Sequence, residues 1–270
     1  MKFSAAILLC IFLVGCTGIN KVLKSKDPEY KLKMAEQYYV KKKYNYAQQL
    51  YEDIMPYYRG LPEFEDIYYK YAYCAYYQQD YLNAENLFKT FLEIYPNSPK
   101  AEEVDYMRAY TFYKQSPKPE LDQSNTIKTI GMMQTFINNH PGSPRNKEAT
   151  EIIDICRQKL ETKDANAAQL YFDLGQFRVA AVSFNELMTS YPDTEKADEY
   201  KMKAIRAYFR LAELSVEEKK AERFEKVINE CNDFIDRFPQ SGFSKEVQQY
   251  LNQSQNNLKL YTNEPAKTSA

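Results

Sequence analysis

The stretch YLNAENLFKTFLEIYPNSP, residues 81–99, combines a helical apolar pattern with a stop signal, and both recur along the chain. An aromatic residue is followed three positions later by a small residue, and then by two bulky residues. These four residues are Tyr81, Ala84, Phe88 and Phe91. Offsets of three and four place their side chains on one helix face, where the small residue lets a second helix approach closely. The stretch therefore predicts a helix that packs tightly against a partner.

This frame occurs five times, twice in a looser form. The other copies begin at Tyr44, Thr126, Phe177 and Phe224. Steps of 37, 45, 51 and 47 residues separate the small residues of successive copies, which are Ala47, Ala84, Thr129, Ala180 and Val227. Helix pairs at such distances resemble the tetratricopeptide family, whose repeat is about 34 residues long. We therefore expect an all-α fold of five tetratricopeptide-like helix-turn-helix repeats, forming a superhelical solenoid with a C-terminal capping helix. A non-repetitive helical bundle is the alternative.

A second recurring signal, aromatic-Pro-x-Ser/Thr, follows four of these helices. With histidine in place of the aromatic residue in one copy, the phrase begins at Tyr95, His140, Tyr191 and Phe238. Proline ends a helix because it lacks an N–H donor and clashes with the preceding turn, whereas the hydroxyl that follows can cap the next helix. Each phrase is therefore expected to separate two helix pairs, with its Ser or Thr as the N-cap.

The stops and the apolar frames together give the bounds of the helices. Pairs are expected at 29–42 with 44–58, 62–79 with 81–95, 99–115 with 124–139 and 194–214 with 218–238. The segment 115–124 is rich in proline and is expected to be a loop. Between 145 and 174 the chain has neither Gly nor Pro, which predicts one long helix before the helix at 177–191. A last helix at 243–260 would cap the array.

The first residues, MKFSAAILLCIFLVGC, contain one lysine and an apolar run that ends in a cysteine. The run is too short for a permanent membrane span and is typical of a secretory signal. Leu13-Val14-Gly15-Cys16 resembles a bacterial lipobox, so we expect a signal peptide at 1–15 and acylation of Cys16, for example with palmitate. An ordinary signal or an uncleaved anchor is the alternative. Thr17, in place of an inner-membrane retention Asp, favours the periplasmic face of the outer membrane.

These signals divide the chain into five parts. They are the signal peptide 1–15, the lipidated cysteine and linker 16–28, N-terminal repeats one to three at 29–142, C-terminal repeats four and five with the capping helix at 143–260, and a disordered tail at 261–270. Lys21, Lys24 and Lys26 in the linker could favour anionic lipid headgroups, although a solvated linker is the simpler interpretation.

Charge and composition argue against several functions. Once Lys2 is lost with the leader, 35 basic residues stand against 37 acidic ones, which disfavours nucleic acid as a partner. His140 is the only histidine, and no Gly-rich phosphate loop or nucleophile elbow is visible, so we expect no metal, no cofactor and no enzymatic activity. The remaining cysteines lie in apolar helical frames and are expected to form no disulfide; they are Cys74, Cys156 and Cys231.

Tyrosine is unusually frequent, with 25 copies and no tryptophan. In stacked helix pairs the first helix of each pair faces the concave side, where aromatic residues at helical spacing could bind an extended peptide. The candidate residues of such a peptide groove are Tyr39, Tyr73, Tyr77 and Phe172. Packing between repeats is the alternative interpretation for each of them.

The chain resembles the BamD family, lipoproteins of the outer-membrane β-barrel assembly machinery, in four features taken together. They are the lipobox, the five helix pairs, the long helix before the fourth pair, and the proline-rich loop before Asp122-Gln123-Ser124. The resemblance covers nearly the whole mature chain and implies a scaffold with two kinds of partner. C-terminal repeats, here about 145–260, would hold the periplasmic domains of the central barrel component. N-terminal repeats, here about 29–115, would receive unfolded barrel substrates.

Two other functions stay open. The chain could be another periplasmic tetratricopeptide lipoprotein, one that coordinates cell-envelope growth or binds peptidoglycan or another glycan. Sugar-binding surfaces often use tryptophan, however, and this chain has none. An envelope enzyme would need catalytic groups in loops such as 115–124, which contains neither His nor Cys.

Overall fold

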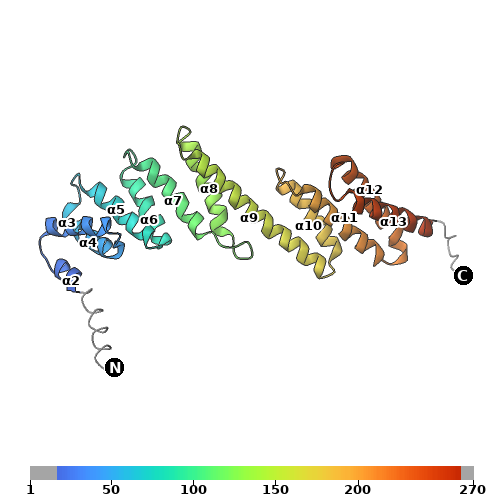
Figure 1. The fold of residues 1–270 in the computed structure, drawn as a ribbon, viewed down its shortest axis with the longest axis horizontal. Coiled ribbons are helices and arrows are strands. Elements are labelled where there is room, and N and C mark those ends of the chain that lie inside the picture. The colour runs from blue at the N-terminus through green and yellow to red at the C-terminus, as the bar shows by residue number, and fades with distance from the viewer. Residues whose placement is uncertain (1–16, 263–270) are drawn as a thin grey trace, which may run out of the picture. The chain divides into compact units, whose positions relative to one another are not determined.

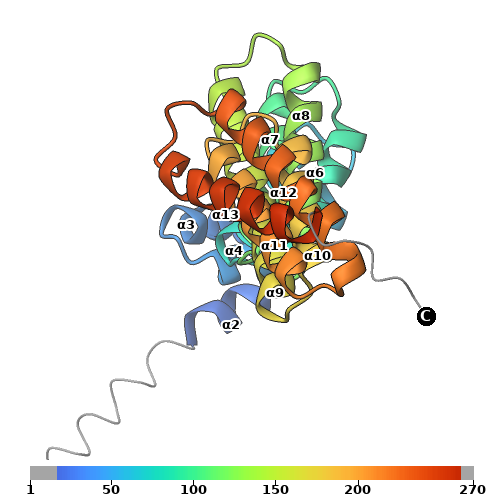
Figure 2. The same ribbon diagram turned by 90° about the vertical axis from the view of Figure 1, so that its right-hand side faces the viewer.

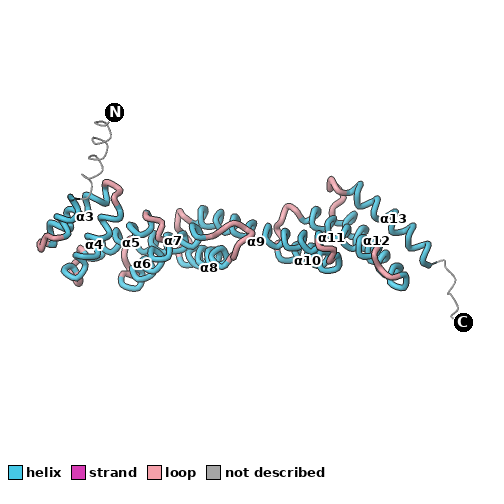
Figure 3. Tube along the Cα trace, turned by 90° about the horizontal axis from the view of Figure 1, so that it is seen from below, coloured by secondary structure: helices cyan, strands magenta, loops and turns pink. Residues whose placement is uncertain are grey.

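The computed structural model describes residues 17–262, and every regular element in that range is an α-helix (Figures 1 and 3). The helices are α2 (Thr17–Leu23), α3 (Pro28–Val40), α4 (Tyr44–Tyr58), α5 (Phe64–Tyr77), α6 (Tyr81–Ile94), α7 (Ala101–Gln115), α8 (Ser124–Asn139), α9 (Asn146–Asp173), α10 (Phe177–Ser190), α11 (Ala197–Glu213), α12 (Glu217–Arg237) and α13 (Ser244–Thr262). From α3 onward, all helix ends lie within three residues of the expected positions, so the all-α prediction is confirmed. None of the described helices combines the length and apolarity that a membrane crossing requires.

Helices that follow one another in sequence also pack against one another. This holds from α3 to α8 and again from α10 to α13. Because each helix contacts mainly its neighbours along the chain, the arrangement is that of a helical repeat. Helix α13 closes the series by packing along α12 and, less extensively, on α11 (Figures 1 and 2). The predicted tetratricopeptide-like pairs and their capping helix are therefore confirmed.

The chain forms two compact units. The first ends at Cys156 and the second starts at Arg157, so the boundary lies inside the long helix α9. The sequence places its division between 142 and 143, at a proline phrase. A helix without an internal breaker can contribute one end to each unit, which is why a stop signal does not mark this boundary.

The apolar frames form the cores of both units. The small residue of every frame is completely buried; these residues are Ala47, Ala84, Thr129, Ala180 and Val227. The two bulky residues that follow it are at most 3% exposed in any of the five copies. A small side chain lets the backbone of the neighbouring helix approach, and the bulky pair fills the space beside it. The frame read from the sequence is therefore the buried face of each second helix.

The aromatic-Pro-x-Ser/Thr phrases differ from the prediction in one respect. The helix after each phrase begins three residues beyond the Ser or Thr, so the hydroxyl is not the N-cap. Its oxygen accepts a hydrogen bond from the N–H two residues later, and the hydroxyl donates to a carboxylate on the first helix of the preceding pair. We call these bonds of 2.6–2.7 Å the Ser/Thr latches: Ser98–Glu65, Ser143–Glu102, Thr194–Glu161 and Ser241–Asp198. Each phrase therefore also joins successive repeats.

Removing one latch should weaken the fold. We expect Thr194→Ala to lower the free energy of unfolding by about 2 kcal/mol, because the buried Glu161 carboxylate loses a charged hydrogen bond. Urea unfolding followed by far-UV circular dichroism measures the change. Ser190→Ala is the matched control, since Ser190 is exposed at the end of α10. Equal stability of the two variants would contradict a stabilising role for the latch.

The N-terminal part differs from the expected linker. Thr17–Leu23 forms helix α2 within it, because Ile19 and Val22 bury their side chains in the core of the first unit beside α3 and α4. Burial of these two apolar side chains stabilises α2, which is too short to be stabilised by helix propensity alone. The predicted signal peptide 1–15 and the predicted lipidation of Cys16 lie outside the described residues.

The C-terminal helix extends slightly beyond the prediction. Tyr261, which the sequence assigns to the tail, belongs to α13 because its ring stacks on Phe224, with centroids 6.1 Å apart and an interplanar angle of 7°. Lys220 Nζ also donates a hydrogen bond to the Tyr261 hydroxyl at 3.2 Å. The rest of the predicted tail, residues 263–270, lies outside the described part of the chain.

Candidate functional site

Three turns that join the two helices of a pair share one geometry. The turns after α3, α5 and α9 each contain a residue at positive φ: Lys42 at 57°, Gln79 at 63° and Gly175 at 75°. An aromatic ring three residues before that position packs on a ring two residues after it. These turn pairs, with centroids 5.2–5.7 Å apart, are Tyr39–Tyr44, Tyr76–Tyr81 and Phe172–Phe177. Packing of the turn therefore accounts for the aromatic residues at positions 39 and 172.

Packing of the turn does not account for the aromatic residue at position 77. It lies one residue after Tyr76, at the position that Val40 and Asp173 occupy in the other two turns. Its ring stacks on Tyr44, with 4.4 Å between centroids and 23° between planes, and Tyr77 is 45% exposed. An exposed ring held by a stack offers a preformed apolar surface, because little rotamer freedom is lost when a ligand binds.

Tyr39 and Tyr73 complete a tyrosine cluster around Tyr77. Their ring centroids lie 6.4 and 5.7 Å from that of Tyr77. We define the tyrosine cluster as Tyr39, Tyr44, Tyr73 and Tyr77, which come from α3, α5 and the start of α4. Burial, with a smaller contribution from the neighbouring phenols, raises the pKa of Tyr39 and of Tyr77. The hydroxyls therefore stay neutral and can donate hydrogen bonds at any physiological pH.

Tyr73 is the buried member of the cluster, with 5% of its surface exposed. Its hydroxyl donates to Glu103 Oε1 at 2.8 Å, and the Tyr69 hydroxyl donates to Oε2 of the same carboxylate at 3.1 Å. Burial is the main cause of the raised pKa values of both tyrosines. The pKa of Tyr73 lies well above its ordinary value, and the pKa of Tyr69 is raised to about 12. Tyr73 therefore supports the cluster from within, while Tyr77 presents its outer surface.

The fourth predicted groove residue, Phe172, belongs to the second unit. It is half-buried, packs on Phe177 across the turn after α9, and lies against the core cluster that contains Phe184. The structure thus brings Tyr39, Tyr73 and Tyr77 together within one unit, and it gives Phe172 a packing position in the other.

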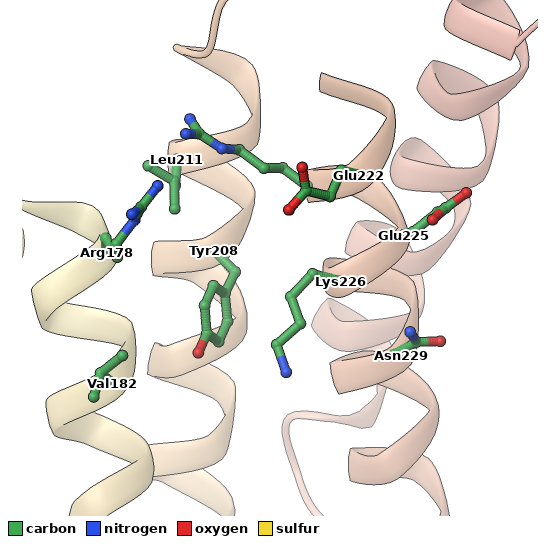
Figure 4. Close-up of a pocket in the computed structure, with 9 residues that line it drawn as sticks. Arg178, Val182, Tyr208, Leu211, Glu222, Glu225, Lys226 and Asn229 are labelled. Carbon is green, nitrogen blue, oxygen red and sulfur yellow. The ribbon is translucent and has the colours of Figure 1, made fainter. Parts of the chain in front are cut away.

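The second unit has a pocket between α10, α11 and α12 that the sequence did not reveal (Figure 4). Its volume is about 490 Å³, and it is lined by Arg178, Val182, Tyr208, Leu211, Glu222, Arg223, Glu225, Lys226 and Asn229. Val182, Tyr208 and Leu211 supply the apolar part of the lining from α10 and α11, and Figure 4 shows the Lys226 side chain extending from α12 into the space beside Tyr208. The pocket therefore combines an apolar wall with charged groups.

Lys226 and Arg178, two of the positively charged side chains that line this pocket, differ in their interactions with neighbouring residues. Lys226 Nζ lies 5.5 Å from the centre of the Tyr208 ring and 2.6 Å from Glu230 Oε1, a hydrogen bond that raises the pKa of the lysine. Arg178, on α10, is exposed and makes no ion pair with any residue in 17–262. An apolar wall beside an available guanidinium suits a protein segment that carries one apolar and one acidic side chain.

The sequence limits a partner surface to about 145–260 without naming side chains. Helix α12 does carry Glu222, Glu225, Lys226 and Asn229 at offsets of three, four and seven, on one face. Such a face is indistinguishable from an ordinary solvated face, because the pattern does not show which neighbour it meets. Only the packing of α10 and α12 against α11 turns it into the wall of a pocket.

Side chains typical of catalytic sites take part in packing here. His140 Nε2 lies 3.2 Å from Asp105 Oδ2, and its ring packs on Phe136. Cys74 and Cys231 are completely buried, which raises the pKa of each thiol to about 12. Within the described range, no three His, Cys, Asp or Glu side chains are arranged to hold a metal ion. The tyrosine cluster and the pocket are therefore the candidate sites that the structure offers.

Comparison with protein families gives one match that covers most of the chain. The model of the family YfiO, described as "Outer membrane lipoprotein", matches residues 25–224. The matched range starts just before α3 and ends inside α12, so it includes parts of both units. A comparison with curated protein sequences gives no match.

Comparison with solved structures gives a general likeness to other helical repeats. The TPR2AB domain of yeast Sti1, solved in a complex with pHSP90, is 14% identical with a TM-score of 0.39, over 84% of this chain and 98% of that one. A kinesin light chain with TPR-like repeats from Podospora anserina is 12% identical with a TM-score of 0.33, over 79% and 96%. The yeast histone chaperone Hif1 is 14% identical with a TM-score of 0.28, over 92% and 99%. Sequence identities and TM-scores this low do not support any conclusion about function.

Proposed function

Because the chain belongs to the YfiO family of outer membrane lipoproteins, we propose that it is a lipid-anchored scaffold whose helical repeats bind other proteins. Stacked helix pairs expose extended faces that are suited to protein ligands. The observation that carries the proposal is the exposed ring of Tyr77, held by its stack on Tyr44 at a position that Val40 and Asp173 occupy in the other two turns of this geometry. Such a scaffold acts through the partners it holds and needs no reactive group of its own.

Anchoring would depend on Cys16, which follows the apolar leader in a lipobox-like sequence. Each buried CH₂ of an acyl chain contributes about 0.8 kcal/mol, so several chains on one cysteine give stable attachment. The protein would then lie on the periplasmic face of the outer membrane. The family description supports the outer membrane, and the lipobox supports the anchor.

The specific role that we propose is that of a BamD-like component of the outer-membrane β-barrel assembly machinery. The repeats in about 145–260 would hold the periplasmic domains of the central barrel component. The pocket between α10 and α12 supports this assignment, because it offers an apolar wall and the exposed Arg178 to a segment of a folded partner. The repeats in about 29–115 would receive unfolded barrel substrates, and the tyrosine cluster supports this second role with an exposed aromatic surface.

Affinity purification tests the partner assignment. A tagged copy is purified from solubilised outer membrane, and the proteins that accompany it are identified by mass spectrometry. We expect a large barrel protein with periplasmic repeat domains, and we expect Arg178→Glu to reduce its recovery. Recovery of cell-wall synthases without such a barrel protein would instead support the alternative, a periplasmic tetratricopeptide lipoprotein that coordinates cell-envelope growth or binds peptidoglycan or glycan.

The substrate assignment predicts a loss of peptide affinity in Tyr77→Ala. The ligand is a peptide from the C-terminus of a barrel protein that ends in an aromatic residue, and its Kd is measured by fluorescence anisotropy. Loss of a stacked aromatic contact at the centre of an interface costs about 2 kcal/mol, or roughly thirtyfold in Kd. Adding Tyr39→Ala should abolish measurable binding, because Tyr39 contacts both Tyr44 and Tyr77.

Tyr57→Ala is the matched control for this prediction. Tyr57 is 64% exposed on α4 of the same unit, but it does not belong to the tyrosine cluster. Its replacement should leave peptide affinity unchanged. If Tyr77→Ala binds the peptide as well as the unmodified protein does, with unchanged helix content by circular dichroism, the cluster is not the substrate site.

A further inference from the structure

Helix α2 has two faces of opposite character. Ile19 and Val22 are 7% and 3% exposed, and both lie in the core of the first unit. Lys21 and Lys24 are exposed and three residues apart, which places them together on the other face. The Lys24 N–H donates to Asn20 O at 3.2 Å, so the helical bonding continues to this lysine. One face of α2 is therefore docked on the protein, and the other carries positive charge.

The connection from α2 to the first repeat is ordered by local hydrogen bonds. The Ser25 N–H donates to Val22 O at 3.0 Å, and the Asp27 N–H donates to Ser25 Oγ at 3.2 Å. The Asp27 carboxylate then caps α3 by accepting from the N–H groups of Glu29 and Tyr30 at 3.0 and 3.2 Å. Both packing and a structured turn thus fix the position of α2 beside α3 and α4 (Figure 1).

The charges on this segment are not neutralised by neighbouring residues. Residues 17–26 contain Lys21, Lys24 and Lys26 and no acidic residue. All three lysines are exposed, and none makes an ion pair with another residue in the described range. The next acid in sequence, Asp27, is engaged as the cap of α3. Three positive charges therefore lie within six residues of sequence at the start of the described chain, a few positions after the lipobox cysteine.

We propose that Lys21, Lys24 and Lys26 form a membrane-contact surface that binds anionic phospholipid headgroups and holds the first repeat against the bilayer. The inference rests on the proposed lipid attachment at Cys16, which immediately precedes α2 and would bring the three lysines to the headgroup layer. Acyl chains and a cationic surface together attach a protein more firmly than either does alone. A lysine beside an anionic surface contributes about 1 kcal/mol, or about fivefold in affinity.

The docked helix also sets the position of the tyrosine cluster. Helices α3 and α4, on which α2 packs, carry Tyr39 and Tyr44 of the cluster. With α2 fixed to these helices and its lysines in the headgroup layer, the cluster is held at a constant height above the bilayer. A linker of ten solvated residues would instead let the first repeat sample a wide range of distances, roughly 15–20 Å by random-coil scaling.

The test uses the mature chain, residues 16–270, with Cys16→Ser so that no acyl chain contributes to binding. Cosedimentation is measured with vesicles of phosphatidylcholine alone and with vesicles that also contain phosphatidylglycerol. We expect binding to the anionic vesicles only, and weaker binding as salt is added. The triple variant Lys21→Gln, Lys24→Gln, Lys26→Gln should bind about a hundredfold less tightly, from about fivefold for each lysine.

A second triple variant, Lys114→Gln, Lys118→Gln, Lys128→Gln, is the matched control. It removes three exposed lysines around the proline-rich loop and leaves the same net charge. The control should bind vesicles like the parent chain. Equal loss in both variants, or equal binding to neutral and anionic vesicles, would overturn the proposal.

Recovery of the barrel partner by affinity purification separates this proposal from the proposed function. If the lysines contact lipid, the lysine variant with Cys16 intact should still recover the partner. Normal vesicle binding with loss of the partner would show that the lysines contact protein instead. Loss of the partner from the parent chain would contradict the scaffold role while leaving the vesicle result valid.

Discussion

Replacement of Phe88 by alanine is expected to lower the free energy of unfolding by about 3–5 kcal/mol, among the largest effects of any single substitution in this protein. Phe88 is completely buried in the frame of α6, and its ring meets Tyr73 edge-on with centroids 5.2 Å apart. Truncation removes the transfer free energy of the ring and leaves a cavity, because helices α5 and α7 are held by other contacts and cannot close the space.

Urea unfolding measures this effect as a shift of the midpoint at constant m-value. Leu82→Ala is the matched control, because Leu82 lies on the same helix and is 69% exposed. The control should change the free energy of unfolding by no more than about 0.5 kcal/mol. Since whole domains have about 5–15 kcal/mol of stability, the predicted loss is a large fraction of the total. A loss no greater than that of the control would show that the frame is not the core.

The second large effect is expected in Lys201→Met, with a loss of about 3 kcal/mol. Lys201 Nζ, on α11, lies 2.6 Å from Glu230 Oε2 and 2.5 Å from Asp233 Oδ2, both on α12. The side chains of Lys201 and Glu230 are only 6% and 9% exposed. Methionine fills a similar volume but leaves a buried carboxylate with Lys226 as its remaining partner, so the cost is electrostatic rather than steric.

Two further variants distinguish this explanation from simple loss of packing. Adding Glu230→Leu to Lys201→Met should recover most of the lost stability, because the uncompensated buried charge is then gone. Lys219→Met should change the free energy of unfolding by less than about 0.5 kcal/mol, since its pair with Glu222 at 3.3 Å is exposed on both sides. If the double variant is less stable than Lys201→Met alone, the buried charge is not the cause.

The effect of Lys201→Met should also depend on pH. Burial alone would raise the pKa of Glu230, but hydrogen bonds from Lys201 and Lys226 outweigh it and hold this pKa below its ordinary value of 4.5. Lys201 likewise holds the pKa of Asp233 below 3.8 against the effect of burial. A lowered pKa in the folded state stabilises the protein above the ordinary pKa, and the gain is lost as pH falls through the folded value. The two proteins should therefore differ most above about pH 5 and converge in stronger acid.

The helices could be predicted because their determinants are local. Helix α6 ends at Ile94, two residues before Pro96, and Gly175 provides the positive φ that closes the turn after α9. Offsets of three and four give the buried face of each second helix. The role of the phrase hydroxyls could not be predicted, because Ser98 and Glu65 are 33 positions apart and meet only when two repeats pack.

The candidate site was predicted in part, for a related reason. Aromatic residues at helical spacing pointed to Tyr39, Tyr73, Tyr77 and Phe172 alike. Their different roles depend on depth and on the neighbouring helix, since Tyr73 is buried on Glu103 while Tyr77 is exposed on Tyr44. A sequence pattern gives the face of a helix that a residue occupies, but not how far the adjacent helix covers it.

The sequence by itself determined the helical repeat and, from α3 onward, the helix bounds to within three residues, because each stop signal and apolar frame acts within a turn or two of the chain. The balanced charge followed from composition alone. The tertiary structure alone decided which aromatic rings stay exposed, which charged side chains line the pocket between α10 and α12, and that α2 docks on the first repeat. These features depend on contacts between residues far apart in the chain, and such contacts arise only when successive helices pack.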